Sequence, residues 1–218
     1  MFEFLNKGKS EKTVRKPVIV EIGPAGMYGL GTVATSWSRK IEEDINKGAI
    51  YIGLDAKPEE LKRHSKDNIY LPVAGDMGKM PFPDNSVDQI WIMNVFSGFH
   101  HLPDLVKGED GRVHQVWVSG MSKYFQELSR VIKPDGKIII GEFGVPIGGP
   151  GAVDYLLDNT DYSRFGFLVN IYVDDNLKEG LKENGFNENL GEIAKSVNEK
   201  ADENLRPFLI TLSKSKTE

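Results

Sequence analysis

The segment from residue 18 to residue 31 constrains the fold of this chain most strongly. It begins with the apolar, β-branched run Val18-Ile-Val-Glu-Ile22 and continues into a turn rich in glycine. A helical pattern follows over residues 32–47. A buried strand, a tight turn and a helix in this order form a nucleotide-sized site, because small residues let backbone amides approach a ligand near the helix N-terminus. We therefore expect an α/β protein built around this unit.

Short apolar runs and helical segments continue to alternate along the rest of the chain. Further strands are predicted at residues 50–54, 69–73, 87–93, 137–143 and 207–212, with another around 190–197. Further helices are predicted at residues 58–66, 116–131 and 174–184, and the second of these is followed by a Lys-Pro-Asp-Gly stop. Strands that alternate with helices predict a parallel sheet covered on both faces.

The length and composition suit one soluble domain. The chain has 218 residues, of which 39% are apolar and 27% are charged, and its net charge is −5. We expect a flexible basic leader at residues 1–16 and a single domain at 17–218. The chain has no cysteine, which excludes disulfides and thiolate metal sites and fits a cytoplasmic protein. No apolar run is long enough to predict a membrane-spanning helix.

Two long segments interrupt the alternation of strands and helices. Residues 97–114 are polar, and residues 144–172 are rich in glycine, proline and aromatic side chains. Loops of this length in a compact domain usually carry function. We expect both segments to be insertions that form a lid or an acceptor-binding region.

Polar residues follow several of the predicted strands, at the sheet edge where open α/β sheets bind ligands. Glu21 and Gly23 lie at the carboxyl end of the first strand, and Asp55 closes the second. Asp76 comes after the third strand, and Asn94 ends the fourth. Asp55 alone could be a helix or turn cap and Asp76 alone could be a turn residue, so it is their order along the chain that predicts a site.

The segments that follow extend this pattern into a family resemblance. The runs GDMGKMPFPDNSVDQIWIMN, FHHLPD and ELSRVIKPDGKIIIGE occur in this order between residues 75 and 142. With the strand and turn at residues 18–26, they resemble the class I S-adenosylmethionine-dependent methyltransferases, in particular the broad small-molecule group. The resemblance implies a Rossmann-like, doubly wound, seven-stranded mixed sheet with an antiparallel C-terminal strand pair. It also implies S-adenosyl-L-methionine as cofactor and methyl transfer by in-line displacement.

The resemblance assigns cofactor contacts along the first two strands. Glu21 and Gly23 would lie near the methionine part of the cofactor, close to the backbone amides of Ala25 and Gly26. Asp55 would accept hydrogen bonds from the ribose hydroxyls.

It assigns three further contacts to the third and fourth strands. Asp76 would accept from the adenine amino group, and Met77 would pack against the adenine ring. Asn94 would lie near the sulfonium and the incoming acceptor.

Acceptor residues are predicted less directly, because methyl transfer depends more on positioning than on a dedicated acid or base. Phe96, His100 and His101 follow the fourth strand and are candidates for acceptor contact, and either histidine is a candidate for catalysis. Adjacent side chains in an extended segment point in opposite directions, so no shared metal site is predicted. Aromatic residues of segment 144–172, such as Tyr162, could contact the acceptor or simply pack.

Several alternatives remain at this point. The family turn is Gly-x-Gly-x-Gly, whereas this chain has Gly23, Ala25 and Met27 at those positions, which favours a non-catalytic binding or sensor protein. The basic leader favours an RNA methyltransferase. A nicotinamide-dependent short-chain enzyme is disfavoured because no tyrosine is followed four residues later by lysine. A small-molecule acceptor is the expectation we develop, with no membrane partner.

Overall fold

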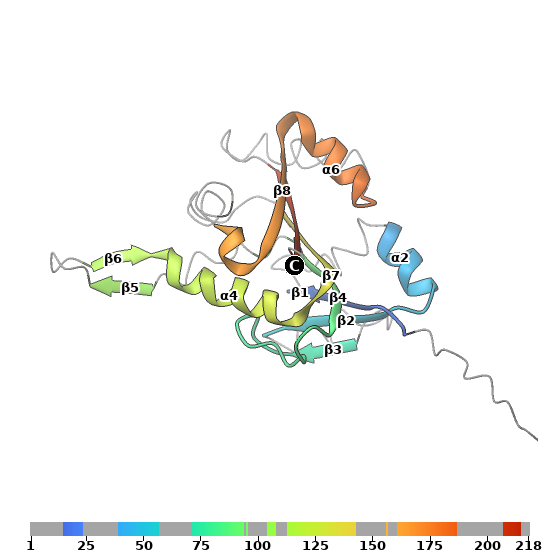
Figure 1. Cartoon of the computed structure of the whole chain (residues 1–218), viewed down its shortest axis with the longest axis horizontal. Coiled ribbons are helices and arrows are strands. Elements are labelled where there is room, and N and C mark those ends of the chain that lie inside the picture. Colours follow the sequence, from blue (N-terminus) through green and yellow to red (C-terminus); the bar gives the residue numbers. More distant parts are fainter. Residues whose placement is uncertain are drawn as a thin grey trace, which may run out of the picture.

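A seven-stranded mixed sheet forms the centre of the protein (Figure 1). The computed structural model describes residues 15–23, 39–56, 71–93, 95, 104–107, 113–142, 156, 161–186 and 207–214. The strands of this sheet are β1 (Val18–Ile22), β2 (Ile50–Asp55), β3 (Leu71–Ala74), β4 (Val87–Met93), β7 (Ile132–Glu142), β8 (Phe167–Val173) and β9 (Phe208–Lys214). Their order across the sheet is β3-β2-β1-β4-β7-β9-β8.

The strand directions confirm the predicted fold class. Strands β3, β2, β1, β4 and β7 pair in parallel, whereas β9 runs antiparallel to both β7 and β8. The chain order reverses at β1, from which β2 and β3 lie on one side and β4 and β7 on the other. A doubly wound sheet binds ligands at this kind of switch point, outside the carboxyl ends of its strands.

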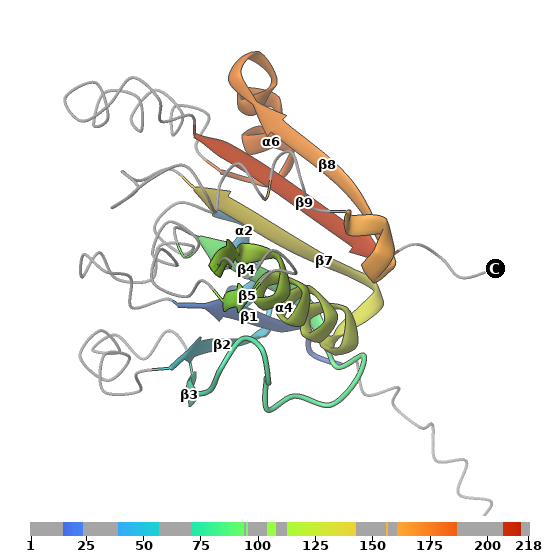
Figure 2. The ribbon, with the colours of Figure 1, turned by 90° about the vertical axis from the view of Figure 1, so that its left-hand side faces the viewer.

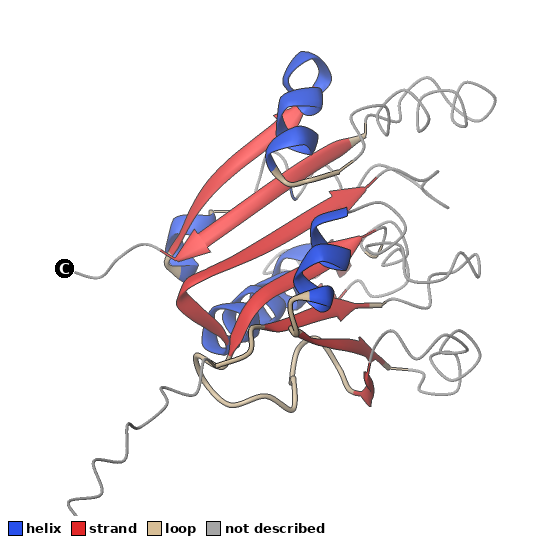
Figure 3. Ribbon diagram, turned by 90° about the vertical axis from the view of Figure 1, so that its right-hand side faces the viewer, coloured by secondary structure: helices blue, strands red, loops and turns tan. Residues whose placement is uncertain are grey.

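Helices cover both faces of the sheet. The helices are α2 (Arg39–Asn46), α4 (Trp117–Val131) and α6 (Leu177–Glu183), with short 3-10 turns η4 (Tyr162–Phe165) and η5 (Asp174–Asn176). Helix α4 lies in front of the sheet in Figure 2, and α2 and α6 lie in front of it in Figure 3, which looks from the opposite side. The described part of the chain therefore forms three layers.

The α4 face holds the larger part of the core. Met121, Phe125 and Leu128 recur at helical spacing, and Phe125 and Leu128 are fully buried against the sheet. The ring of Phe125 packs edge-on against Tyr162, with centroids 5.2 Å apart. Tyr162 is itself buried, and its hydroxyl donates to the carbonyl of Leu156 at 2.7 Å. The aromatic residue of η4 that could have contacted an acceptor is thus part of the core.

The opposite face has a smaller apolar cluster. Trp91 of β4 is fully buried there, and its ring meets Phe186 edge-on at 5.2 Å. Leu177 and Leu181 of α6 belong to the same cluster, and Ile45 of α2 packs against it. The two clusters use alternate residues of the central strands, as a parallel sheet buried on both faces requires.

The C-terminal strand pair differs in one partner from the sequence prediction. Strand β9 pairs with β8, whose residues 167–173 fall partly within the segment predicted to be an insertion at 144–172. The apolar run Phe-Leu-Val-Asn-Ile-Tyr-Val forms an edge strand, which tolerates a polar residue and exposed apolar side chains such as Leu168 and Val169. The predicted strand at 190–197 and the predicted helix at 58–66 lie outside the described residues.

Two other elements depart from expectation. Strand β7 is assigned from Ile132, so the predicted Lys-Pro-Asp-Gly turn lies within it as an irregularity, where the register with β4 shifts between Val87 and Gln89. The predicted insertion at 97–114 contributes to a separate two-stranded antiparallel sheet of β5 (Asp104–Lys107) and β6 (Val113–Val116). Among the described residues, no helix has the length and apolar character to cross a membrane.

Candidate functional site

The carboxyl ends of the parallel strands lie along one edge of the sheet (Figure 2). The register pairs Ile22 with Leu54 and with Ile92, so β1, β2 and β4 reach this edge together. Asp55 pairs with Ala74, and Met93 pairs with Gly141, which brings the ends of β3 and β7 to the same edge. Polar residues that are distant in sequence therefore follow one another along this edge.

Glu21 is a buried carboxylate on β1. Its exposed fraction is 1%, and it lies on the sheet face of the smaller apolar cluster. The hydroxyl of Tyr51, on the neighbouring strand β2, donates a hydrogen bond to Glu21 Oε2. Burial of a carboxylate costs free energy unless the carboxylate is hydrogen-bonded. The hydrogen bond from Tyr51 therefore stabilises Glu21 at its buried position near the sheet edge.

Gly23 begins the turn after β1 in a conformation that favours glycine. Its φ is +66°, and its amide donates to the carbonyl of Leu54 at 2.8 Å. A Cβ at this position would lie 2.9 Å from Cγ2 of Val95, which follows β4. The turn is therefore tied to β2 and packed closely against the end of β4. The absence of a side chain lets these three segments meet.

Asp55 ends β2 and is partly exposed. Its carbonyl accepts from the amide of Gly75 at 2.9 Å, which joins the end of β2 to the turn after β3. In the strand order Asp55 lies one strand from Glu21 and Gly23. The position suits a carboxylate that accepts from a ligand held across β1 and β2.

Asp76 lies in a tight turn after β3, and its side chain is 58% exposed. Its Oδ1 accepts from the Gly78 amide at 2.8 Å, and its Oδ2 lies 3.4 Å from Nζ of Lys123 on α4. Met77 is 6% exposed and packs in the larger core cluster, so its side chain anchors the turn from below. The exposed carboxylate of Asp76 is thus next to a buried side chain, Met77, that fixes the turn to the core.

A second polar cluster lies just beyond this turn. Glu127 of α4 accepts from the Met80 amide at 2.7 Å and from Arg130 Nε at 2.8 Å. Arg130 also donates to the carbonyls of Met80 and Phe82, at 3.1 and 2.9 Å, and to Asp84 Oδ1 at 2.6 Å. Two residues of α4 thereby hold the irregular segment between β3 and β4.

The charges of this cluster reinforce one another. The hydrogen bonds from Arg130 and, to a lesser extent, from the Met80 amide lower the pKa of Glu127 below its ordinary value, although burial opposes this change. Hydrogen bonds to Glu127 and Asp84 raise the pKa of Arg130. The pair is therefore fully ionised at neutral pH.

Reasoning from the sequence did not assign a role to several residues of this edge. Glu127 and Arg130 lie in the run that carries the family resemblance, and their i, i+3 spacing on a predicted helix is the signal that could have identified an ion pair. Tyr51 and Lys123 gave no such signal. Glu142, at the carboxyl end of β7, is a further buried carboxylate with an exposed fraction of 4%.

The structure brings together four of the predicted cofactor residues, namely Glu21, Gly23, Asp55 and Asp76, with Met77 beneath the last. The other predicted site residues lie outside the described part of the chain; they are Ala25, Gly26, Asn94, Phe96, His100 and His101. The basic leader that favoured an RNA substrate lies almost entirely outside it as well. Within the described ranges, no group of three or more histidine, aspartate or glutamate side chains is arranged to hold a metal ion.

Comparison with known proteins finds similarity to methyltransferases. Residues 29–108 match the family described as a methyltransferase domain. A curated relative, the ubiquinone/menaquinone biosynthesis C-methyltransferase UbiE of Laribacter hongkongensis, is 26% identical over 123 residues. These residues are 53% of this chain and 40% of the relative, so the match spans less than half of the relative's length.

Solved structures share the fold. A TehB-like S-adenosylmethionine-dependent methyltransferase from Corynebacterium glutamicum aligns over 92% of this chain and 82% of its own, with a TM-score of 0.50 and 19% identity. The cyclase SpnF aligns over 91% of this chain and 75% of its own, with a TM-score of 0.51 and 14% identity. Proteins named for different reactions thus share this fold. The reaction therefore has to be inferred from the residues of the site and not from the fold.

The strand order is the one that the sequence resemblance implied, and the matched methyltransferase domain and the curated C-methyltransferase relative agree with that resemblance. The resemblance seen in the sequence is thereby confirmed.

Proposed function

We propose that this protein binds S-adenosyl-L-methionine and transfers its methyl group to a small-molecule acceptor. One observation carries the proposal. The ends of three neighbouring strands present a buried carboxylate, a glycine turn and two accessible carboxylates, in the order in which the methionine, ribose and adenine parts of the ligand would follow. Glu21 lies on β1, Gly23 in the turn after it, Asp55 at the end of β2, and Asp76 in the turn after β3.

The residues present fit such a ligand. A Cβ at Gly23 would collide with Val95, so this position requires glycine. Only backbone atoms of Gly23 are therefore available to the methionine part of the ligand. In this proposal Asp55 accepts from the two ribose hydroxyls, and the exposed carboxylate of Asp76 accepts from the adenine amino group. Each is a hydrogen bond to a charged acceptor, which contributes about 1.5–3 kcal/mol.

The chemistry that the cofactor supplies when bound is an electrophilic methyl group on a sulfonium. The part of the protein is to hold the ligand, to orient an acceptor in line with the methyl–sulfur bond, and to exclude water. We assign the acceptor contacts to Phe96, His100 and His101. No side chain of the chain has to form a covalent intermediate in such a displacement.

Calorimetric titration with S-adenosylmethionine and S-adenosylhomocysteine tests the proposal. We expect both to bind, and we expect Asp55→Ala to weaken both by about 1–3 kcal/mol, or roughly 5- to 150-fold. Asp135→Ala is the matched control, because Asp135 is an exposed aspartate in the irregular, amino-terminal part of β7. Unchanged affinity in Asp55→Ala would show that the ribose ligand is assigned wrongly.

A second candidate is binding without methyl transfer. It is favoured by the altered turn, in which Ala25 and Met27 replace the usual glycines. Incubation of the protein with methyl-labelled cofactor and a metabolite extract separates the two candidates. A labelled product that depends on the protein supports transfer, whereas cofactor binding with no such product supports the sensor.

A further inference from the structure

Helix α4 presents three polar side chains along one face toward the turn that carries Asp76. Lys123, Glu127 and Arg130 are spaced by four and three residues, so they lie one above another on the helix. We call these three residues the α4 polar stripe, and residues 75–80 the Asp76 turn. The function described above does not use the stripe.

The first contact of the stripe is at Asp76 itself. Lys123 Nζ lies 3.4 Å from Asp76 Oδ2. The stem of Lys123 lies directly over Gly78, where an added Cβ would meet Lys123 Cε at 2.5 Å. The amide of Gly78 in turn donates to the other carboxylate oxygen of Asp76. Lys123 thus covers the turn that fixes the orientation of the carboxylate.

The second and third contacts hold the far end of the same turn. The Met80 amide donates to Glu127 and the Met80 carbonyl accepts from Arg130, so both backbone groups of Met80 are bound to α4. The turn is closed between its ends by the amide of Lys79, which donates to the carbonyl of Asp76 at 2.9 Å. Met80, which α4 holds, therefore directly follows the residue whose amide bonds to Asp76.

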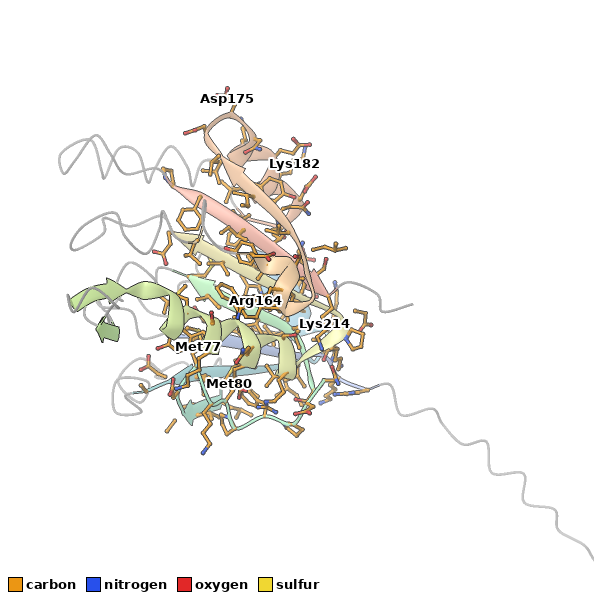
Figure 4. All side chains as sticks on the ribbon, turned by 60° about the vertical axis from the view of Figure 1, so that its left-hand side comes forward. Met77, Met80, Arg164, Asp175, Lys182 and Lys214 are labelled. Carbon is orange, nitrogen blue, oxygen red and sulfur yellow. The ribbon has the colours of Figure 1, made fainter. Side chains whose placement is uncertain are left out.

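The underside of the turn is fixed by packing. Met77 and Met80 are 6% and 3% exposed, and both lie beside α4 in Figure 4. The turn thus has buried anchors below and charged contacts from α4, while the carboxylate of Asp76 keeps 58% of its side-chain surface open. This arrangement fixes a group while leaving it accessible to a ligand.

We propose that the α4 polar stripe is a positioning device that makes the site selective for 6-aminopurine nucleosides over 6-oxopurine nucleosides. An amino group donates to the fixed carboxylate, whereas an oxo group would place a second acceptor against it. The inference rests on the proposed function, because it takes Asp76 as the residue that contacts the base. Lys123, Glu127 and Arg130 act through Asp76 and do not touch the ligand.

The test compares the affinities of S-adenosylhomocysteine and S-inosylhomocysteine, which differ at this purine position. The wild-type protein is expected to prefer the adenosyl compound at least about tenfold. Arg130→Met and Lys123→Met are each expected to reduce that preference at least about threefold. Lys133→Met is the matched control, because Lys133 pairs with Asp88, a residue of β4 outside the Asp76 turn, at a partly buried site.

The outcomes separate this inference from the proposed function. Wild-type protein that binds neither compound would remove both proposals. Wild-type protein that binds both compounds equally would overturn the stripe and the contact of Asp76 with the base, but not cofactor binding itself. A preference that survives in Arg130→Met and Lys123→Met would overturn the stripe alone. So would an equal loss of preference in Lys133→Met at the same melting temperature. If Arg130→Met does not fold, Lys123→Met decides, because its ammonium is exposed.

Discussion

The hydroxyl of Tyr51 on β2 donates a hydrogen bond to the carboxylate of Glu21 on β1, and both side chains are almost completely buried. The two residues lie on adjacent parallel strands and on the same face of the sheet, where Tyr51 pairs with Ile19, two residues before Glu21. The contact links the strand that precedes the glycine turn to the strand that ends at Asp55. Glu21 is thereby held by a partner whose position does not depend on a ligand.

Replacement of Tyr51 by phenylalanine removes this donor from a buried carboxylate. We expect the free energy of unfolding to fall by about 1.5–3 kcal/mol, measured by urea denaturation at neutral pH. Tyr172→Phe is the control, because the Tyr172 hydroxyl donates to Glu183 at 2.7 Å in an exposed position. Its loss should cost less than about 1 kcal/mol. Equal costs for the two variants would contradict the importance of burial at Glu21.

Replacement of Gly23 by alanine tests the packing of the turn. The positive φ costs about 1–2 kcal/mol for a residue with a Cβ, and the contact with Val95 adds about 1–3 kcal/mol. Gly166→Ala isolates the first cost, since Gly166 has a φ of +77° with no atom within 4 Å of the added Cβ. We expect Gly23→Ala to be the more destabilising in thermal melts and to weaken cofactor binding. A smaller loss of stability in Gly23→Ala than in Gly166→Ala would show that Val95, at the end of β4, moves to make room for the added methyl group.

The ion pair of Glu127 and Arg130 predicts a pH-dependent stability. Because the pKa of Glu127 is lowered from its ordinary value of 4.5 in the folded protein, its stabilisation is present above that value. It is lost as the pH falls through the lower, folded pKa. Glu127→Gln should therefore cost about 1–3 kcal/mol at pH 7, and the difference from wild type should shrink below about pH 4.5.

Urea denaturation at a series of pH values measures this difference. Glu179→Gln, a change at an exposed residue of α6, is the control and should follow the wild-type curve throughout. A difference between Glu127→Gln and wild type that stays constant down to pH 3 would contradict the assignment.

Removal of the Phe125 ring tests how far the η4 segment depends on α4. Phe125 is fully buried and lies 5.2 Å from Tyr162 and 5.6 Å from Phe165, between ring centroids. Phe125→Ala should cost about 3–5 kcal/mol, which thermal denaturation would measure. Phe125→Leu keeps most of the volume and should cost less. Identical melting temperatures for the two variants would argue against a packed aromatic cluster.

The elements with a strong local signal were predictable from the sequence. The run at residues 18–22 has β-branched residues on both faces and forms a central strand, and α4 has apolar residues at helical spacing that the core buries. Strand β8 was missed because an edge strand needs only one buried face. Because Leu168 and Val169 are apolar and exposed, the sequence of β8 does not alternate between apolar and polar residues. The glycine- and proline-rich sequence before it suggested a loop.

The candidate site was predictable where a residue ends a strand. Glu21, Gly23, Asp55 and Asp76 were predicted in this way to lie near one edge of the sheet, because the carboxyl ends of parallel strands must meet there, and the strand register agrees with that placement. The contacts between α4 and the Asp76 turn were not predictable, since they join residues about 47 positions apart, through a backbone group of Met80 and through the carboxylate of Asp76. Such contacts depend on where the helix is placed on the sheet.

The most direct test of the account is a crystal structure of the protein with S-adenosylhomocysteine. The account predicts that the adenosyl group lies across the carboxyl ends of β1 and β2, with its ribose hydroxyls on Asp55 and its amino group on Asp76. A ligand bound elsewhere, or crystals grown at saturating ligand in which this edge of the sheet holds none, would contradict it.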